Sequence, residues 1–226
     1  MTILSGAYVT TLLVTAGASL ALCVGARRRP GRWVVGADRI LAVALLAVSA
    51  EWVWTTGRSG DWTAARSLPL ALCDVATLVA AAGLWWRRPL LVELTWFWGL
   101  AGSLQSLLTP DVRVGFPSAT FVEYVVAHAG IVTAALSLVV GQRITPRRGA
   151  APRVLLITAA YTAVVGAVDA WTGGDYMYLR SPPGSWTLLR VLGPWPWYVF
   201  SAAGVAVVLV VALAAPFRLS RAGRAA

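Results

Sequence analysis

The chain has 226 residues, of which 58% are hydrophobic and 12% are charged, and its formal net charge is +10. Apolar stretches of about twenty residues recur along it, which excludes an ordinary soluble protein and predicts a polytopic membrane protein. All 19 basic residues are arginine, and they stand at the ends of apolar stretches. That placement follows the positive-inside rule of membrane proteins, so we expect no nucleic-acid partner.

Arginine clusters, prolines and glycine-rich breaks divide the chain into seven apolar segments. Each is long enough to cross about 30 Å of hydrocarbon as a helix. We therefore expect an all-α fold, a seven-transmembrane-helix bundle in a single domain over residues 1–226. The expected helices are 5–25, 37–57, 67–86, 89–108, 118–140, 151–171 and 195–216. Because only Arg87, Arg88 and Pro89 separate the third and fourth helices, these two should form a tight hairpin.

The arginines also predict an orientation in the cell membrane. With the N-terminus outside and the C-terminus in the cytoplasm, most arginines fall on the inner side. The outer side then keeps Arg58, Arg66, Arg113, Arg180 and Arg190. We expect the first helix to be retained, because no basic residue precedes it and three arginines follow it directly. Leu22 before Cys23 also argues against lipoprotein processing, which needs a small residue there.

Several classes of function are excluded by what the sequence lacks. Without lysine there is no Schiff base for a retinal photoreceptor. No phosphate-binding glycine loop, HExxH, CxxC or GxSxG motif occurs, so we expect no cofactor and no metal site. Cys23 and Cys73 should lie near opposite membrane faces, which makes a disulfide between them implausible.

Polar residues within the apolar segments are the most informative feature, because they usually face a bundle interior or a watery cavity. On the expected topology they lie in the outer half of the membrane or near its middle, and only Glu93 lies on the inner side. The outer set is Glu51, Cys73, Asp74, Gln105, Glu123, His128 and Asp169. It predicts a polar chamber open to the outside. The alternatives are carboxylates that snorkel to the interface, an inert buried cysteine and a histidine that only packs.

Four stretches resemble the YwaF-like family of bacterial integral membrane proteins. They are LPLALCD at 68–74, LLTPDVRVGFP at 107–117 with the following His128, GGDYMYLRSPP at 173–183, and GPWPWY at 193–198. That family is similar to an animal family of multi-pass Cys–His acyltransferases that act on phospholipids. The resemblance implies that Cys73 is the nucleophile and His128 the base. One departure is Ala71, which stands where the bacterial pattern LPLHLC has a histidine. This difference bears on whether the chain catalyses a reaction on lipid.

The expected function is therefore a lipid acyltransferase or hydrolase, with membrane phospholipids as partners and no prediction of oligomeric state. We expect substrate contacts from Glu51, Asp74, Gln105, Glu123, Tyr124, Asp169, Tyr176, Tyr178 and Trp197. A transporter using the same chamber and a structural or regulatory subunit remain alternatives. The aromatic segment 173–198 is expected to fold over the outer mouth as a lid, with Tyr176, Tyr178 and Trp197 toward the chamber. Alternatively, these aromatics only anchor the last helix at the interface.

Overall fold

The structure is a computed structural model that describes residues 6–112, 114–184 and 187–222, and these residues form helices and loops without a strand. In chain order the elements are α1 (Gly6–Arg28), α2 (Arg32–Arg58), α3 (Leu72–Trp86), α4 (Pro89–Trp98), the π-helical turn η1 (Gly99–Ser103), α5 (Leu104–Leu108), α6 (Ala119–Leu136), the π-helical turn η2 (Ser137–Gly141), α7 (Ala150–Thr172), the 3₁₀ turn η3 (Leu188–Val191) and α8 (Trp197–Ala222). The segments α4, η1 and α5 follow one another without a break, as do α6 and η2.

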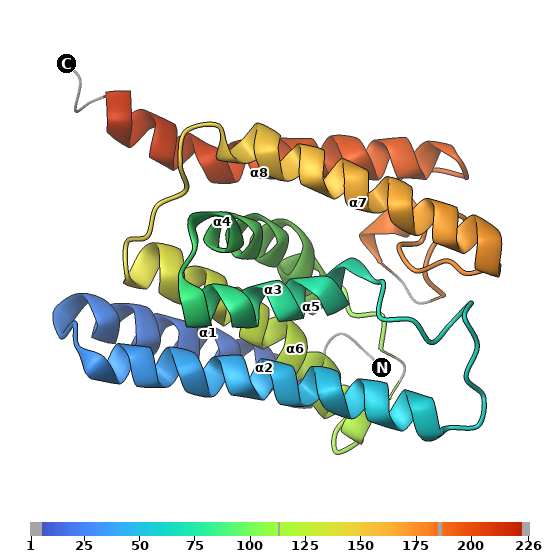
Figure 1. Cartoon of the computed structure of the whole chain (residues 1–226), viewed down its shortest axis with the longest axis horizontal. Coiled ribbons are helices and arrows are strands. Elements are labelled where there is room, and N and C mark those ends of the chain that lie inside the picture. The colour runs from blue at the N-terminus through green and yellow to red at the C-terminus, as the bar shows by residue number, and fades with distance from the viewer. Residues whose placement is uncertain (1–5, 113, 185–186, 223–226) are drawn as a thin grey trace.

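The helices form three groups, as Figure 1 shows. The antiparallel pair α1 and α2 lies on one side, α7 and α8 lie on the other, and α3, α4 and α6 lie between them. The central helix α3 packs against α2, α4 and α6. Small residues allow these close approaches: a Cβ atom at Gly130 of α6 would lie 2.7 Å from Cδ2 of Leu45 on α2. Such contacts are typical of helix packing in membranes, where dispersion replaces the hydrophobic effect.

Five helices in the described part of the chain are long and apolar enough to cross a membrane: Tyr8–Arg28, Arg32–Arg58, Ala119–Gly141, Ala150–Thr172 and Trp197–Arg218. Apolar side chains on their outer faces are exposed, among them Ile40 at 74%, Leu156 at 72% and Val208 at 67%. The chain is thus an all-helical, multi-pass membrane protein. The segment α3 is apolar but has only 15 residues, or about 22 Å of helix. Seven crossings therefore stay a prediction.

The helix expected at 67–86 begins later than predicted, at Leu72. Pro69 disfavours helical geometry at the preceding Leu68, and side chains of the C-terminal half bind the backbone of this stretch instead. The Tyr176 hydroxyl accepts a bond from the Leu68 N–H at 3.0 Å, and the Tyr161 hydroxyl donates to the Leu70 carbonyl at 2.8 Å. Cys73 consequently lies in the first turn of α3, whereas the sequence had placed it nearly two turns into a helix.

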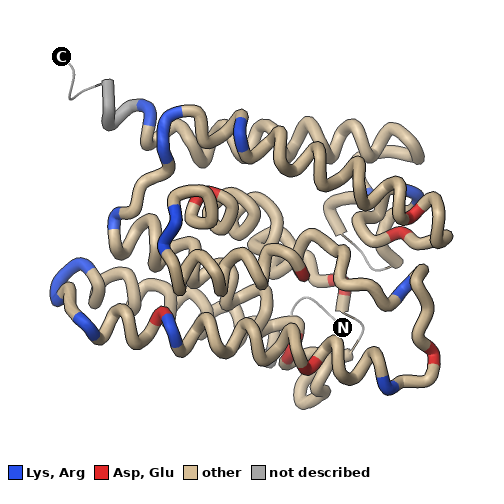
Figure 2. The backbone as a smooth tube through the Cα atoms, viewed as in Figure 1, with Lys and Arg blue, Asp and Glu red and all other residues tan. Residues whose placement is uncertain are grey.

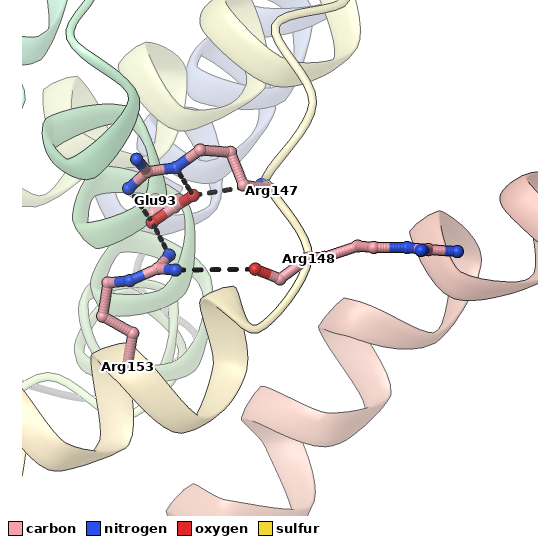
Figure 3. Close-up of polar contacts among 4 residues, drawn as sticks. All are labelled: Glu93, Arg147, Arg148 and Arg153. Atoms are coloured by element: carbon pink, nitrogen blue, oxygen red, sulfur yellow. Dashed lines mark hydrogen bonds and ion pairs between the residues drawn. The ribbon is translucent and has the colours of Figure 1, made fainter.

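Arginines gather at one end of the molecule, where α1, α3, η2 and α8 end (Figure 2). Glu93 of α4 is fully buried at this end and accepts bonds from the Arg147 Nε at 2.8 Å and the Arg153 Nη1 at 2.8 Å (Figure 3). A second buried carboxylate, Asp38 of α2, pairs with the Arg87 Nη2 at 2.8 Å. Both acids are paired and hydrogen-bonded, as buried charges must be.

Candidate functional site

A cavity of about 190 Å³ lies between α2, α3, α6 and the loop before α6, far from the arginine-rich end. Its lining residues are Trp52, Cys73, Asp74, Thr77, Val112, Thr120, Glu123, Tyr124, Ala127 and His128. It therefore brings together five of the residues that the sequence singled out, two from α3 and three from α6. The volume suits the reacting part of a lipid, because pockets that enclose a whole small molecule hold about 300–1,000 Å³.

Cys73 is the second residue of α3, and this position matters for its chemistry. The Asp74 carboxylate accepts a hydrogen bond from the Ala71 N–H at 3.0 Å and so caps the helix. In the described structure, the backbone N–H groups of Leu72 and Cys73 have no hydrogen-bond partner. These free donors form the positive end of the helix dipole. This end of the dipole favours a negative charge on the Cys73 sulfur or on a substrate oxygen beside it, whereas burial of the thiol and the neighbouring Asp74 carboxylate oppose the charge on sulfur.

The thiol also faces a hydroxyl from the neighbouring helical segment. Its Sγ lies 3.9 Å from the Ser106 Oγ. Ser106 belongs to α5, which follows the π-helical turn η1. A π-helical turn contains one residue more than an α-helical turn, so it rotates the helix beyond it by about 100° and decides which side chains of α5 face α3.

His128 is held in one orientation and one tautomer. Its Nδ1 lies 2.8 Å from the Tyr124 carbonyl oxygen. A carbonyl can only accept, so Nδ1 carries the hydrogen and Nε2 keeps a free lone pair. The Tyr124 ring stacks on the imidazole with 4.1 Å between centroids, and its hydroxyl donates to the Ser106 carbonyl at 2.6 Å. The imidazole is therefore fixed with a basic nitrogen available, and it is 8% exposed.

The other polar residues of the predicted set divide into two groups. Asp74 and Glu123 line the cavity, and Asp74 interacts electrostatically with His128. Glu51 is exposed and influences Glu123 electrostatically, and Gln105 is half-buried. Neither residue lines the cavity, so substrate contacts from Glu51 and Gln105 stay a prediction. Among the described residues, no three His, Cys, Asp or Glu side chains lie close enough to hold a metal ion.

Asp169 belongs to the scaffold outside the cavity. It is 1% exposed, and its carboxylate accepts the Tyr176 N–H at 3.1 and 3.2 Å. The Tyr176 hydroxyl in turn donates to the Ala64 carbonyl at 2.6 Å. Neither Asp169 nor Tyr176 lines the cavity, so their contact with substrate stays a prediction. They hold the loop after α7 against the loop before α3.

The aromatic segment between α7 and α8 is folded onto the loops around the cavity. The Tyr178 hydroxyl donates to the Asp111 Oδ2 at 2.8 Å, and Asp111 is the neighbour of the lining residue Val112. The Tyr198 hydroxyl donates to the Tyr178 carbonyl. Tyr178 itself does not line the cavity. Trp197 is 66% exposed, packs on Phe200 and does not line the cavity, so its role toward substrate stays a prediction. Its exposed ring fits the interfacial anchor considered as the alternative.

Six residues around the site were not predicted from the sequence. Five line the cavity, namely Trp52, Thr77, Val112, Thr120 and Ala127. The sixth, Ser106, contacts the thiol. A signal for Ser106 exists, because Ser103 and Ser106 are three residues apart and share one face of an apolar helix.

No curated protein and no solved structure is significantly similar to the chain. A family model described as the TMEM164 family, a family of transmembrane proteins, matches residues 3–214. Because this match covers nearly the whole chain, the protein belongs to the TMEM164 family.

Proposed function

We propose that the protein is a membrane acyltransferase or hydrolase that acts on phospholipids through Cys73 and His128. The observation that carries the proposal is that Cys73 and His128 line the same cavity. Membership of a transmembrane family and the four stretches that resemble YwaF-like proteins, with their similarity to Cys–His acyltransferases, support it. The proposed arrangement has seven membrane crossings, with the cavity toward the outside and the C-terminus in the cytoplasm.

In the first half-reaction, the His128 Nε2 takes the proton of the Cys73 thiol. The thiolate attacks the carbonyl carbon of a lipid ester, and the carbonyl oxygen becomes an oxyanion. When the oxyanion collapses, the bond to the glycerol oxygen breaks, and this oxygen leaves with the proton from His128. The products are a lysolipid and a thioester on Cys73.

The second half-reaction reverses the roles. The hydroxyl of an acceptor lipid, or water, gives its proton to the His128 Nε2 and attacks the thioester carbonyl. The carbon–sulfur bond then breaks, and the Cys73 sulfur leaves and recovers the proton from the imidazolium. The choice of acceptor decides between acyl transfer and hydrolysis.

The first turn of α3 supplies the electrostatic part of this mechanism. The unpaired N–H groups of Leu72 and Cys73 offer donors to the thiolate and the oxyanion, a kind of contribution that is worth about 10²–10³-fold in rate elsewhere. The Asp74 carboxylate, which interacts with His128, stabilises the imidazolium that forms twice per cycle. Ala71 is the residue before α3 and does not line the cavity, so proton transfer here depends on His128.

The test is acyl turnover by the purified full-length protein in phospholipid nanodiscs, read by mass spectrometry of lipids and protein. Cys73→Ala should abolish turnover and the thioester adduct. His128→Ala should lower the rate by about 10²–10⁴-fold, because it removes the general base. Cys23→Ala is the matched control, since Cys23 is the other free cysteine and lies outside the cavity.

Full turnover by Cys73→Ala would overturn the covalent mechanism. The transporter alternative rests on the acids in the same cavity and predicts the opposite pattern. In that case Cys73→Ser would leave function intact, whereas Asp74→Asn or Glu123→Gln would abolish substrate movement.

A further inference from the structure

A second and larger cavity, of about 360 Å³, lies at the arginine-rich end of the molecule. Its lining residues are Phe97, Pro146, Arg147, Arg148, Gly149, Ala150, Ala151, Ala214, Phe217 and Arg218. It thus lies between α4, the loop before α7, the start of α7 and the C-terminal part of α8. It shares no lining residue with the cavity at Cys73, and nothing in the proposed acyl transfer uses it.

The charge of this second cavity is positive. Three of its lining residues are arginines and none is a carboxylate. Behind the wall, Glu93 is shared by Arg147 and Arg153, so it cannot neutralise the whole cluster. Figure 3 shows the Arg148 side chain extending away from Glu93 toward α8. In the described structure, neither the Arg148 nor the Arg218 guanidinium forms an ion pair.

The start of α7 adds a second feature that favours an anion. This helix of 23 residues begins at Ala150, has Gly149 before it, and no side chain caps its first turn. Gly149, Ala150 and Ala151 all line the cavity. The positive end of a long helix dipole therefore faces this space, which favours a phosphate there. Within the first turn the Ala150 N–H is bonded to the Arg147 carbonyl at 3.2 Å and Pro152 has no N–H, so the Ala151 N–H is the backbone donor left for a phosphate oxygen.

The rest of the wall is apolar, and this distinguishes a lipid from a free anion. Phe97 is fully buried, Ala151 is 3% and Ala214 is 7% exposed, and Phe217 packs edge-on against Trp96. Beyond the cavity, α7 and α8 expose apolar faces of membrane-crossing length. A free phosphate would leave these apolar walls without a partner, whereas a phospholipid matches both the charged and the apolar surfaces.

We infer that this cavity is a binding site for one anionic phospholipid of the cytoplasmic leaflet. Its phosphate contacts Arg148, Arg218 and the start of α7, and an acyl chain follows α8 past Ala214. Arg147 is held by Glu93 and shapes the wall beside the phosphate. Lipid binding at this cavity does not depend on the proposed chemistry at Cys73.

The test measures lipid retention by the full-length protein with native mass spectrometry, after titration with phosphatidylglycerol or phosphatidylcholine, and with inorganic phosphate as a separate ligand. We expect one tightly retained phosphatidylglycerol. Arg148→Ala combined with Arg218→Ala should weaken its apparent affinity by about tenfold or more, because two charge-assisted contacts to the phosphate are lost. Ala214→Phe keeps the charges but fills the apolar wall, and it should also weaken phosphatidylglycerol binding.

The matched control is Arg28→Ala combined with Arg29→Ala, which removes two exposed arginines from the same end of the molecule but outside the cavity. It should retain phosphatidylglycerol like the wild type. Equal loss in this control would show general attraction to the basic end and overturn a specific site. Unchanged binding in the Arg148 and Arg218 variant would overturn the site, and inorganic phosphate competing as well as lipid would overturn the lipid assignment.

Discussion

Single side chains link the loops near the cavity at Cys73 to one another. Tyr176 bridges from its place near Asp169 to the loop before α3, and Tyr178 reaches the loop before α6 through Asp111. Asp111 is adjacent to Val112 in the cavity wall. These two tyrosines thus connect the segment after α7 with the loops that frame the candidate site. Burial raises the pKa of Tyr178, and the hydrogen bond to Asp111 raises it further.

The pKa of Tyr178 predicts that the segment after α7 loosens at alkaline pH. A raised pKa means that the docked segment favours the neutral hydroxyl. Below the ordinary tyrosine pKa of about 10, both docked and undocked segments keep the proton and docking is fully stabilised. As the pH rises above about 10, the undocked segment loses its proton first and docking weakens. Limited proteolysis at residues 173–190 should therefore accelerate between about pH 9 and pH 11.

Tyr178→Phe is the control for this prediction. It lacks the hydroxyl, so it should be cut faster than the wild type near pH 8 and show a weaker acceleration at alkaline pH. Identical pH profiles for the two proteins would show that Tyr178 does not control docking.

At the scale of elements, the helical segments could be predicted from apolar length and from breaks at arginine, proline and glycine. The start of α3 is encoded only in part by the local signal at Pro69, because its position also depends on Tyr161 and Tyr176, which lie far away in the sequence. Cys73 and His128 could be selected as polar residues in apolar segments and through a family resemblance. Their shared cavity depends on how α3 packs on α6, and no local pattern encodes that packing. The same limit applies to Glu51 and Gln105, which do not line the cavity, because depth along a helix does not tell which helix face turns inward.

At the scale of the whole molecule, the two ends have different chemistry. One end carries most of the arginines with the buried acids Asp38 and Glu93, and the other carries the cavity with Cys73 and the aromatic segment. The positive-inside rule predicts that the arginine-rich end faces the cytoplasm. The cavity at Cys73 would then face the outside and the basic cavity the cytoplasmic leaflet.

Fusions to a phosphatase that is active only outside the cytoplasm can check this orientation. Fusions after Gly60 and Gly115 should be active, because these residues lie in the loop after α2 and the loop before α6, at the end opposite the arginine-rich end. Fusions after Arg148 and Arg221 should be silent. Activity after Arg221 would reverse the assignment of both cavities.

The shortness of α3 and the burial of Glu93 also constrain biogenesis. On the proposed topology, α3 is too short to be stable alone in the bilayer, so it should leave the translocon together with α4 as a hairpin. The ion-pair partners of Glu93 in α4 are Arg147 and Arg153, which lie 54 and 60 residues farther along the chain. Before these arginines are synthesised, the unpaired Glu93 carboxylate opposes membrane insertion by up to about 3 kcal/mol. We therefore expect α3 and α4 to insert stably only after the start of α7 has been synthesised.

A glycosylation acceptor placed in the loop 109–118 would report this step in microsomes. It should be modified efficiently in the full-length chain and poorly in a chain that ends at residue 141. Glu93→Leu should restore modification of the short chain, and equal modification of all three would contradict the dependence. Arg147 and Arg153 would then make insertion depend on how far synthesis has proceeded. If translation stops before them, the hairpin of α3 and α4 is not stably inserted in the membrane.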